Sequence, residues 1–102
     1  MISSDEGFGI LKNWYTHQGK LWRVTVNAPD DAFGPETTIE SLSNDPPGIV
    51  LSHLGKSKLE ALDLAGATFD SRRPTGFESD KFISFLSITL AGGESLLLVE
   101  MR

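Results

Sequence analysis

The sequence predicts a mainly β fold, with an N-terminal helix and five or six mostly antiparallel strands forming a small barrel or a two-layer sheet. Two observations lead to this prediction. Two apolar runs flank the pair Gly92 and Gly93 near the end of the chain, and two shorter runs flank a turn at 44–48 that contains two prolines and a glycine. Both patterns are typical of β-hairpins. A sheet of this size must curl or stack to protect its edge strands. The chain of 102 residues is long enough for a single domain over 1–102.

The chain should begin with a helix over residues 3–19. Ser3 and Glu6 have the spacing of a capping box, and Gly19 is placed to end the helix. Two glycines in the first turns oppose the prediction, because each costs about 1 kcal/mol relative to alanine inside a helix. The face expected to be buried carries apolar residues at helical spacing: Ile10, Leu11, Trp14 and Tyr15.

Three strands are predicted next, over residues 21–27, 37–43 and 49–54, and the last two should form a hairpin. In the first strand Trp22 begins an alternating apolar row, so we expect this side chain in the core. Pro29 ends that strand, because proline has no N–H to donate to a neighbouring strand.

The stretch 56–70 has two interpretations. Ser57 and Glu60 have capping-box spacing, which would give a short helix at 57–65 and an α+β fold. The same residues also fit two strand segments separated by a β-bulge at Gly66. We favour strand, because the preceding strands already form a meander.

The register of the C-terminal hairpin depends on its loop. If Gly92 and Gly93 form a two-residue loop, Ala91 pairs with Glu94 and every later pair follows. A change of one residue in the loop would exchange the two faces. With the two-residue loop, one face is apolar and consists of Phe82, Leu86, Ile88, Leu90, Leu97, Val99 and Met101. The other face is mixed, with Thr89 beside Leu96, Ser87 beside Leu98, and Phe85 beside Glu100.

The mixed face needs cover, either from a helix of the same chain or from a second copy, because it would expose large apolar side chains. We therefore expect a homodimer. On this register Leu97→Asp should unfold the domain, whereas Leu98→Asp should be milder for folding and should dissociate the oligomer. The expected oligomer interface consists of Ile83, Phe85, Leu96 and Leu98.

The composition excludes several classes of function. The formal net charge is -5, which opposes nucleic-acid binding, since such binding depends on basic residues neutralising phosphates. The chain has no cysteine, and therefore no disulfide, thiolate metal site or thiol nucleophile. It contains neither an apolar run long enough to span a membrane nor a basic leader followed by an apolar run. We expect a soluble, cytoplasmic protein without membrane contact.

We find no catalytic, metal or cofactor motif. Residues 55–57 (Gly-Lys-Ser) resemble the end of a phosphate-binding loop, but Val50 stands where that loop needs its first glycine. The two histidines lack neighbours at metal-ligand spacing. We therefore expect no metal and no cofactor. An enzyme would need a site assembled from distant residues, such as His17, His53, Asp30 and Glu78.

These observations favour a non-catalytic protein that acts through protein–protein interaction and self-association. The partner would be a second copy or another protein. The alternative is a small-molecule-binding barrel whose mouth is lined by large aromatics and by a basic pair. An enzyme is the third hypothesis. The candidate binding residues are Trp14, Tyr15, Arg72 and Arg73.

Overall fold

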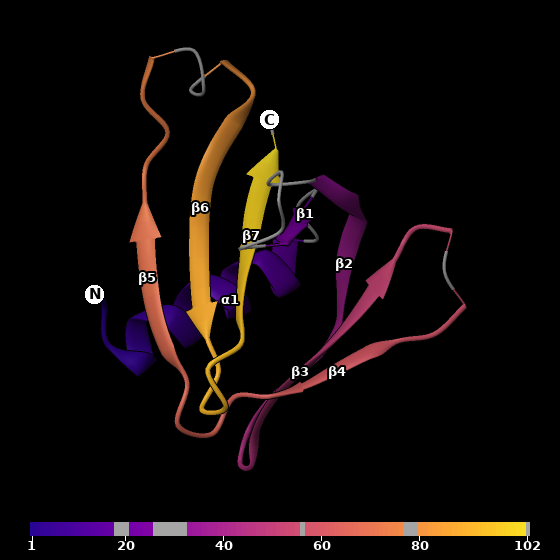
Figure 1. Cartoon of the computed structure of the whole chain (residues 1–102), viewed down its shortest axis with the longest axis vertical. Coiled ribbons are helices and arrows are strands. Elements are labelled where there is room, and N and C mark those ends of the chain that lie inside the picture. The colour runs from indigo at the N-terminus through magenta and orange to yellow at the C-terminus, as the bar shows by residue number, and fades with distance from the viewer. Residues whose placement is uncertain (18–20, 26–32, 56, 77–79, 102) are drawn as a thin grey trace.

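The computed structural model of the chain describes residues 1–17, 21–25, 33–55, 57–76 and 80–101. Within these residues the chain forms one helix and seven strands, which confirms the mainly β fold with an N-terminal helix (Figure 1). The stretch 57–65 contains no helix, so the α+β alternative is wrong. The elements are α1 (Ser4–His17), β1 (Leu21–Thr25), β2 (Phe33–Asn44), β3 (Pro47–His53), β4 (Glu60–Asp63), β5 (Thr68–Arg72), β6 (Phe82–Thr89) and β7 (Ser95–Met101).

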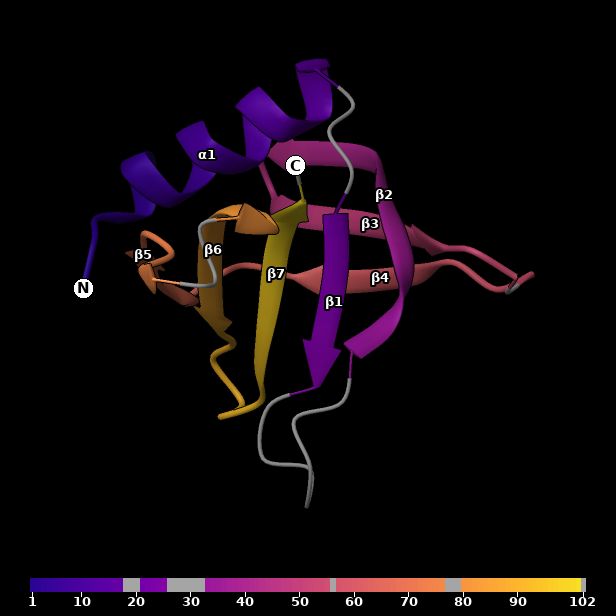
Figure 2. The ribbon, with the colours of Figure 1, turned by 90° about the horizontal axis from the view of Figure 1, so that it is seen from above.

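The seven strands form one antiparallel sheet in the order β4-β3-β2-β1-β7-β6-β5. Its two edge strands, β4 and β5, are consecutive in the sequence and are joined only by residues 64–67. Laid flat, seven strands would place the edges about 29 Å apart, whereas this connection reaches at most about 18 Å when extended. The sheet therefore has to curl, and Figure 2 shows the resulting half-barrel.

The hairpin around 44–48 is confirmed, because β2 pairs with β3 and Asn44 lies opposite Pro47. The prediction of a β-bulge at Gly66 is wrong. Gly66 has a φ of +74° and lies in the turn between β4 and β5, which is a conformation that glycine adopts without strain.

Helix α1 lies across the open side of the half-barrel and contacts both β2 and β5 (Figure 2). Its start is capped as predicted, since the N–H of Glu6 donates to Oγ of Ser3 at 3.1 Å. Just before the cap, the N–H of Ile2 donates to the carbonyl oxygen of Phe69 at 3.1 Å and ties the chain to the β5 edge. The predicted end at Gly19 lies outside the described residues. In the part of the chain described, no helix is both long enough and apolar enough to cross a membrane.

The buried face of α1 consists of Gly7, Leu11 and Trp14. The ring of Phe69 packs directly on Gly7, where a Cβ would lie only 2.4 Å from Cγ of Phe69. Phe8 meets the same ring edge to face, with centroids 5.8 Å apart. The glycine that weakens the helix prediction is thus the residue that lets the helix approach β5.

The main core lies between α1 and the inner face of the curled sheet. Leu62 of β4 packs against this core, and the buried residues come from the helix, the other six strands and the 64–67 turn: Leu11, Trp14, Leu21, Ile39, Ile49, Leu51, Leu64, Ala67, Phe69, Leu86, Ile88, Leu96 and Leu98. A second apolar group, here called the outer cluster, lies on the opposite face of β1, β6 and β7. It consists of buried Phe85 and Val99 with partly buried Trp22, Phe82, Leu97 and Met101.

The C-terminal hairpin has a three-residue loop where two residues were predicted. The N–H of Leu90 donates to the carbonyl of Glu94 at 2.7 Å, and the N–H of Gly93 donates to the carbonyl of Leu90 at 2.9 Å. Gly93 has a φ of +95°, as expected for the last position of such a loop. The predicted register is therefore wrong by one residue. The observed pairs include Thr89 with Ser95, Ile88 with Leu96, Leu86 with Leu98, and Phe85 with Val99.

The shift in register moves the residues of β7 to the opposite face relative to β6, so that Leu96 and Leu98 join Leu86 and Ile88. Leu96 and Leu98 point into the main core, where their exposed fractions are 2% and 0%. Leu97 lies in the outer cluster and is only partly buried. The sequence-based expectation for the two aspartate substitutions is thus reversed.

Leu98→Asp should lower the free energy of unfolding by about 4 kcal/mol or more, because it places an unpaired charge in the core. Leu97→Asp should cost about 1–2 kcal/mol, since water reaches this side chain. Urea denaturation followed by circular dichroism measures both. A larger loss for Leu97→Asp would contradict the observed register.

Gly7→Ala should lower the free energy of unfolding by about 1–3 kcal/mol, although alanine favours helix, because the new methyl group overlaps the Phe69 ring. Gly9→Ala is the matched control. Nothing lies within 4 Å of a Cβ at that position, so this variant should gain up to about 1 kcal/mol. Thermal or urea unfolding measures the free energy of unfolding of both variants. Equal effects of the two substitutions would contradict the packing of α1 on Phe69.

Candidate functional site

A cleft of about 600 Å³ separates one flank of α1 from the ends of β5, β6 and β7. This volume lies within the range of small-molecule sites. The helix, the end of β5 and the β6–β7 hairpin all contribute to its lining: Glu6, Gly9, Ile10, Asn13, Trp14, Ser71, Arg72, Arg73, Ser84, Phe85 and Glu100.

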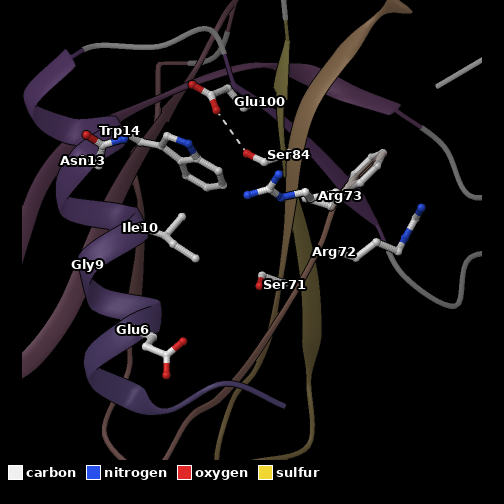
Figure 3. A pocket seen from close by; sticks show the side chains of 11 residues that line it. Glu6, Gly9, Ile10, Asn13, Trp14, Ser71, Arg72, Arg73, Ser84 and Glu100 are labelled. Atoms are coloured by element: carbon white, nitrogen blue, oxygen red, sulfur yellow. Dashed lines mark hydrogen bonds between the residues drawn. The ribbon is translucent and has the colours of Figure 1, made fainter. Parts of the chain in front are cut away.

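Strand alternation decides which side chains enter the cleft from the end of β5. Phe69 points into the core, so Ser71 and Arg73 point to the same side, toward the helix (Figure 3). Arg72 points the other way, and its guanidinium carbon lies 4.3 Å from the ring centroid of Phe85. This distance is typical of a cation–π contact. Both arginines contribute to the lining, but only Arg73 directs its guanidinium toward the helix.

The β6–β7 hairpin brings a polar pair to the same place. Ser84 and Glu100 are cross-strand partners, and Oγ of Ser84 donates to Oε1 of Glu100 at 3.1 Å. They follow the buried core pair Leu86 and Leu98 along the same face, so the core ends where the polar part of the cleft begins. Both polar side chains are partly buried.

The cleft holds opposite charges that do not pair with each other. Arg73 forms no hydrogen bond or ion pair with any residue in the described parts of the chain, and its side chain is exposed. Glu100 is held by Ser84. Figure 3 shows both charged groups extending from the sheet toward Trp14 of the helix. A further carboxylate, that of Glu6, lies along the same helix flank.

The predicted binding residues are partly brought together. Trp14, Arg72 and Arg73 line the cleft, and Trp14 is only 3% exposed. Tyr15 is not among the lining residues and is 42% exposed on another face of α1. Sequence reasoning missed the Ser84–Glu100 pair, because the two residues become neighbours only on the observed register.

The residues of the predicted oligomer interface lie apart from one another. Leu96 and Leu98 are covered from within the chain, and Phe85 is 5% exposed in the outer cluster. Ile83 is 44% exposed at an irregularity in β6, where the pairing with β7 shifts between Phe82 and Ser84. The mixed face from which this interface was predicted is therefore divided: Leu96 and Leu98 belong to the main core, Phe85 belongs to the outer cluster, and Ile83 is exposed.

The two histidines bond to separate partners. His17 Nδ1 lies 2.8 Å from the carbonyl oxygen of Asn13 in the last turn of α1. His53 lies between Thr37 and Glu60, with Nδ1 2.8 Å from Oγ1 of Thr37 and Nε2 3.0 Å from Oε1 of Glu60. The dispersed enzyme site also named Asp30 and Glu78, which lie outside the described residues.

The hydrogen bonds link a hydroxyl (Thr37), an imidazole (His53) and a carboxylate (Glu60). A catalytic nucleophile, its base and the carboxylate that orients the base would be linked in the same order. A nucleophilic hydroxyl must be reachable by the substrate, yet Thr37 is 1% exposed. The network instead links β2, β3 and β4, on which its three members lie. No cluster of three or more metal-ligating side chains occurs among the described residues.

Known proteins offer no guide to the cleft. Comparison with protein-family models, with curated proteins and with solved structures finds no match for this chain. The chemistry of the cleft is therefore inferred from its own residues.

Proposed function

We propose that this chain is a non-catalytic binding protein whose cleft between α1 and the ends of β5, β6 and β7 takes up a small organic molecule. The observation that carries the proposal is the convergence of Trp14 and Arg73, 59 positions apart in the sequence, on one cleft of about 600 Å³. Such sites combine apolar surface with a few convergent polar groups. Here Ile10 and Trp14 supply the apolar surface, and Arg73 and Glu100 the polar groups.

The absence of catalysis is part of the proposal. The hydroxyl of Thr37 is buried, and neither histidine lines the cleft. Binding without reaction requires only the contacts that the lining offers.

A second proposal concerns the outer cluster. Trp22, Phe82, Leu97 and Met101 come from three adjacent strands and are partly exposed around buried Phe85 and Val99. Partly exposed apolar groups of this kind occur at protein interfaces. We propose that two copies of the chain associate through this face. The cytoplasmic location expected from the sequence remains a prediction that cell fractionation would test.

Ligand binding in the cleft should change the fluorescence of Trp14 and leave Trp22 unaffected. These are the only two tryptophans, and Trp22 belongs to the outer cluster. We expect a metabolite library to contain compounds that shift the emission of the protein and of Trp22→Phe. The same compounds should leave the emission of Trp14→Phe unchanged. A response that survives in Trp14→Phe and is lost in Trp22→Phe, or no response to any compound, would contradict the cleft proposal.

Self-association should depend on Leu97. Sedimentation velocity at micromolar concentration should show a dimer, and Leu97→Asp should convert it to a monomer while the circular dichroism spectrum stays folded. Leu54→Asp is the control, because Leu54 is 70% exposed between β3 and β4 and should not affect association. A monomer at all concentrations would refute the dimer proposal.

A further inference from the structure

We propose that the cleft takes a zwitterion, namely an α-amino acid with an apolar or aromatic side chain; the inference rests on the proposed binding function of the cleft. The feature behind it is the pair of opposite charges, Arg73 and Glu100, which line one cleft and do not form an ion pair with each other. A molecule that carries both charges at one end satisfies both groups together.

Arg73 suits the carboxylate of such a ligand. A guanidinium offers a planar fork of N–H donors that matches the two oxygens of a carboxylate. Arg73 has no partner among the described residues, and its side chain points into the cleft (Figure 3). The neighbouring hydroxyl of Ser71 lies on the same side and is a further donor.

Glu100 suits the ammonium group. Oε1 accepts the hydroxyl of Ser84 at 3.1 Å, which orients the carboxylate and leaves Oε2 to accept from the ligand. An ionised carboxylate has about four acceptor positions, so one internal hydrogen bond does not exhaust it. Glu100 is also partly buried, and a charge-assisted hydrogen bond is strengthened where water is partly excluded.

The apolar part of the cleft suits the side chain of the amino acid. Ile10 and Trp14 extend from α1 toward the sheet and form the apolar part of the lining (Figure 3). Ligands with a single charge fit less well. A phosphate or a simple acid that pairs with Arg73 leaves Glu100 facing an anion, and a simple amine meets the positive charge of Arg73.

The test compares three molecules of the same shape: L-phenylalanine, 3-phenylpropanoate, which lacks the amine, and 2-phenylethylamine, which lacks the carboxylate. Each is titrated to millimolar concentration while the indole N–H resonance of Trp14 is followed by NMR, with the resonance of Trp22 as an internal reference. We expect saturable shifts of Trp14 with L-phenylalanine. Binding of either single-charge analogue should be weaker by about tenfold or more, because each loses one charge-assisted hydrogen bond.

Two variants that each remove one of the charges should shift this preference in opposite directions. Arg73→Gln removes the positive charge, so it should lose L-phenylalanine and gain relative affinity for 2-phenylethylamine. Glu100→Gln keeps an acceptor for Ser84 and should gain relative affinity for 3-phenylpropanoate. Lys58→Gln is the control, since it also removes one positive charge, but from an exposed residue between β3 and β4 that does not line the cleft. It should bind all three molecules as the unchanged protein does.

The outcomes separate the two proposals. If an analogue with one charge binds as tightly as L-phenylalanine, the zwitterion inference is wrong and the cleft remains a binding site. If none of the three binds while a library compound shifts Trp14 fluorescence, the zwitterion inference again fails alone. If no compound changes the fluorescence or the NMR resonance of Trp14, both proposals are wrong.

Discussion

The contact between Phe69 and the bare backbone of Gly7 holds this fold together, because it joins the helix to the edge of the sheet. Phe69 is 2% exposed, it pairs with Ile88 in the sheet, and its carbonyl accepts the N–H of Ile2 just before the helix. Any side chain at position 7 would push the helix away from β5. A close approach that only glycine permits therefore sets the distance between the helix and the sheet.

The position of the helix also explains the cleft. α1 contacts β2 and β5, two strands separated by three others in the sheet, and so it crosses the mouth of the half-barrel. Where the core pair of Leu86 and Leu98 gives way to Ser84 and Glu100, the sheet no longer presents apolar surface to the helix. The cleft lies at this point, with apolar lining from Ile10 and Trp14 and charged lining from Arg73 and Glu100.

The sequence was sufficient for the fold class, the helix with its cap and the middle hairpin, because each rests on local patterns. It was insufficient for the final hairpin. Two- and three-residue loops both use glycine at positive φ, and one residue of difference moved Leu96 and Leu98 from a predicted surface into the core. The same error hid the Ser84–Glu100 pair. Trp14 and Arg73 were proposed from the sequence as residue types suited to binding, and only the tertiary structure reveals that they line one cleft while Tyr15 does not.

The most direct test of this account is the NMR signal of the two α-protons of Gly7. One of them should be shifted strongly upfield by the ring current of Phe69 and should show a nuclear Overhauser effect to the ring protons of that residue, because the ring lies where a Cβ would be. Two α-protons with ordinary shifts and no such effect would mean that the helix is not seated on β5. The core and the cleft described here would then both be wrong.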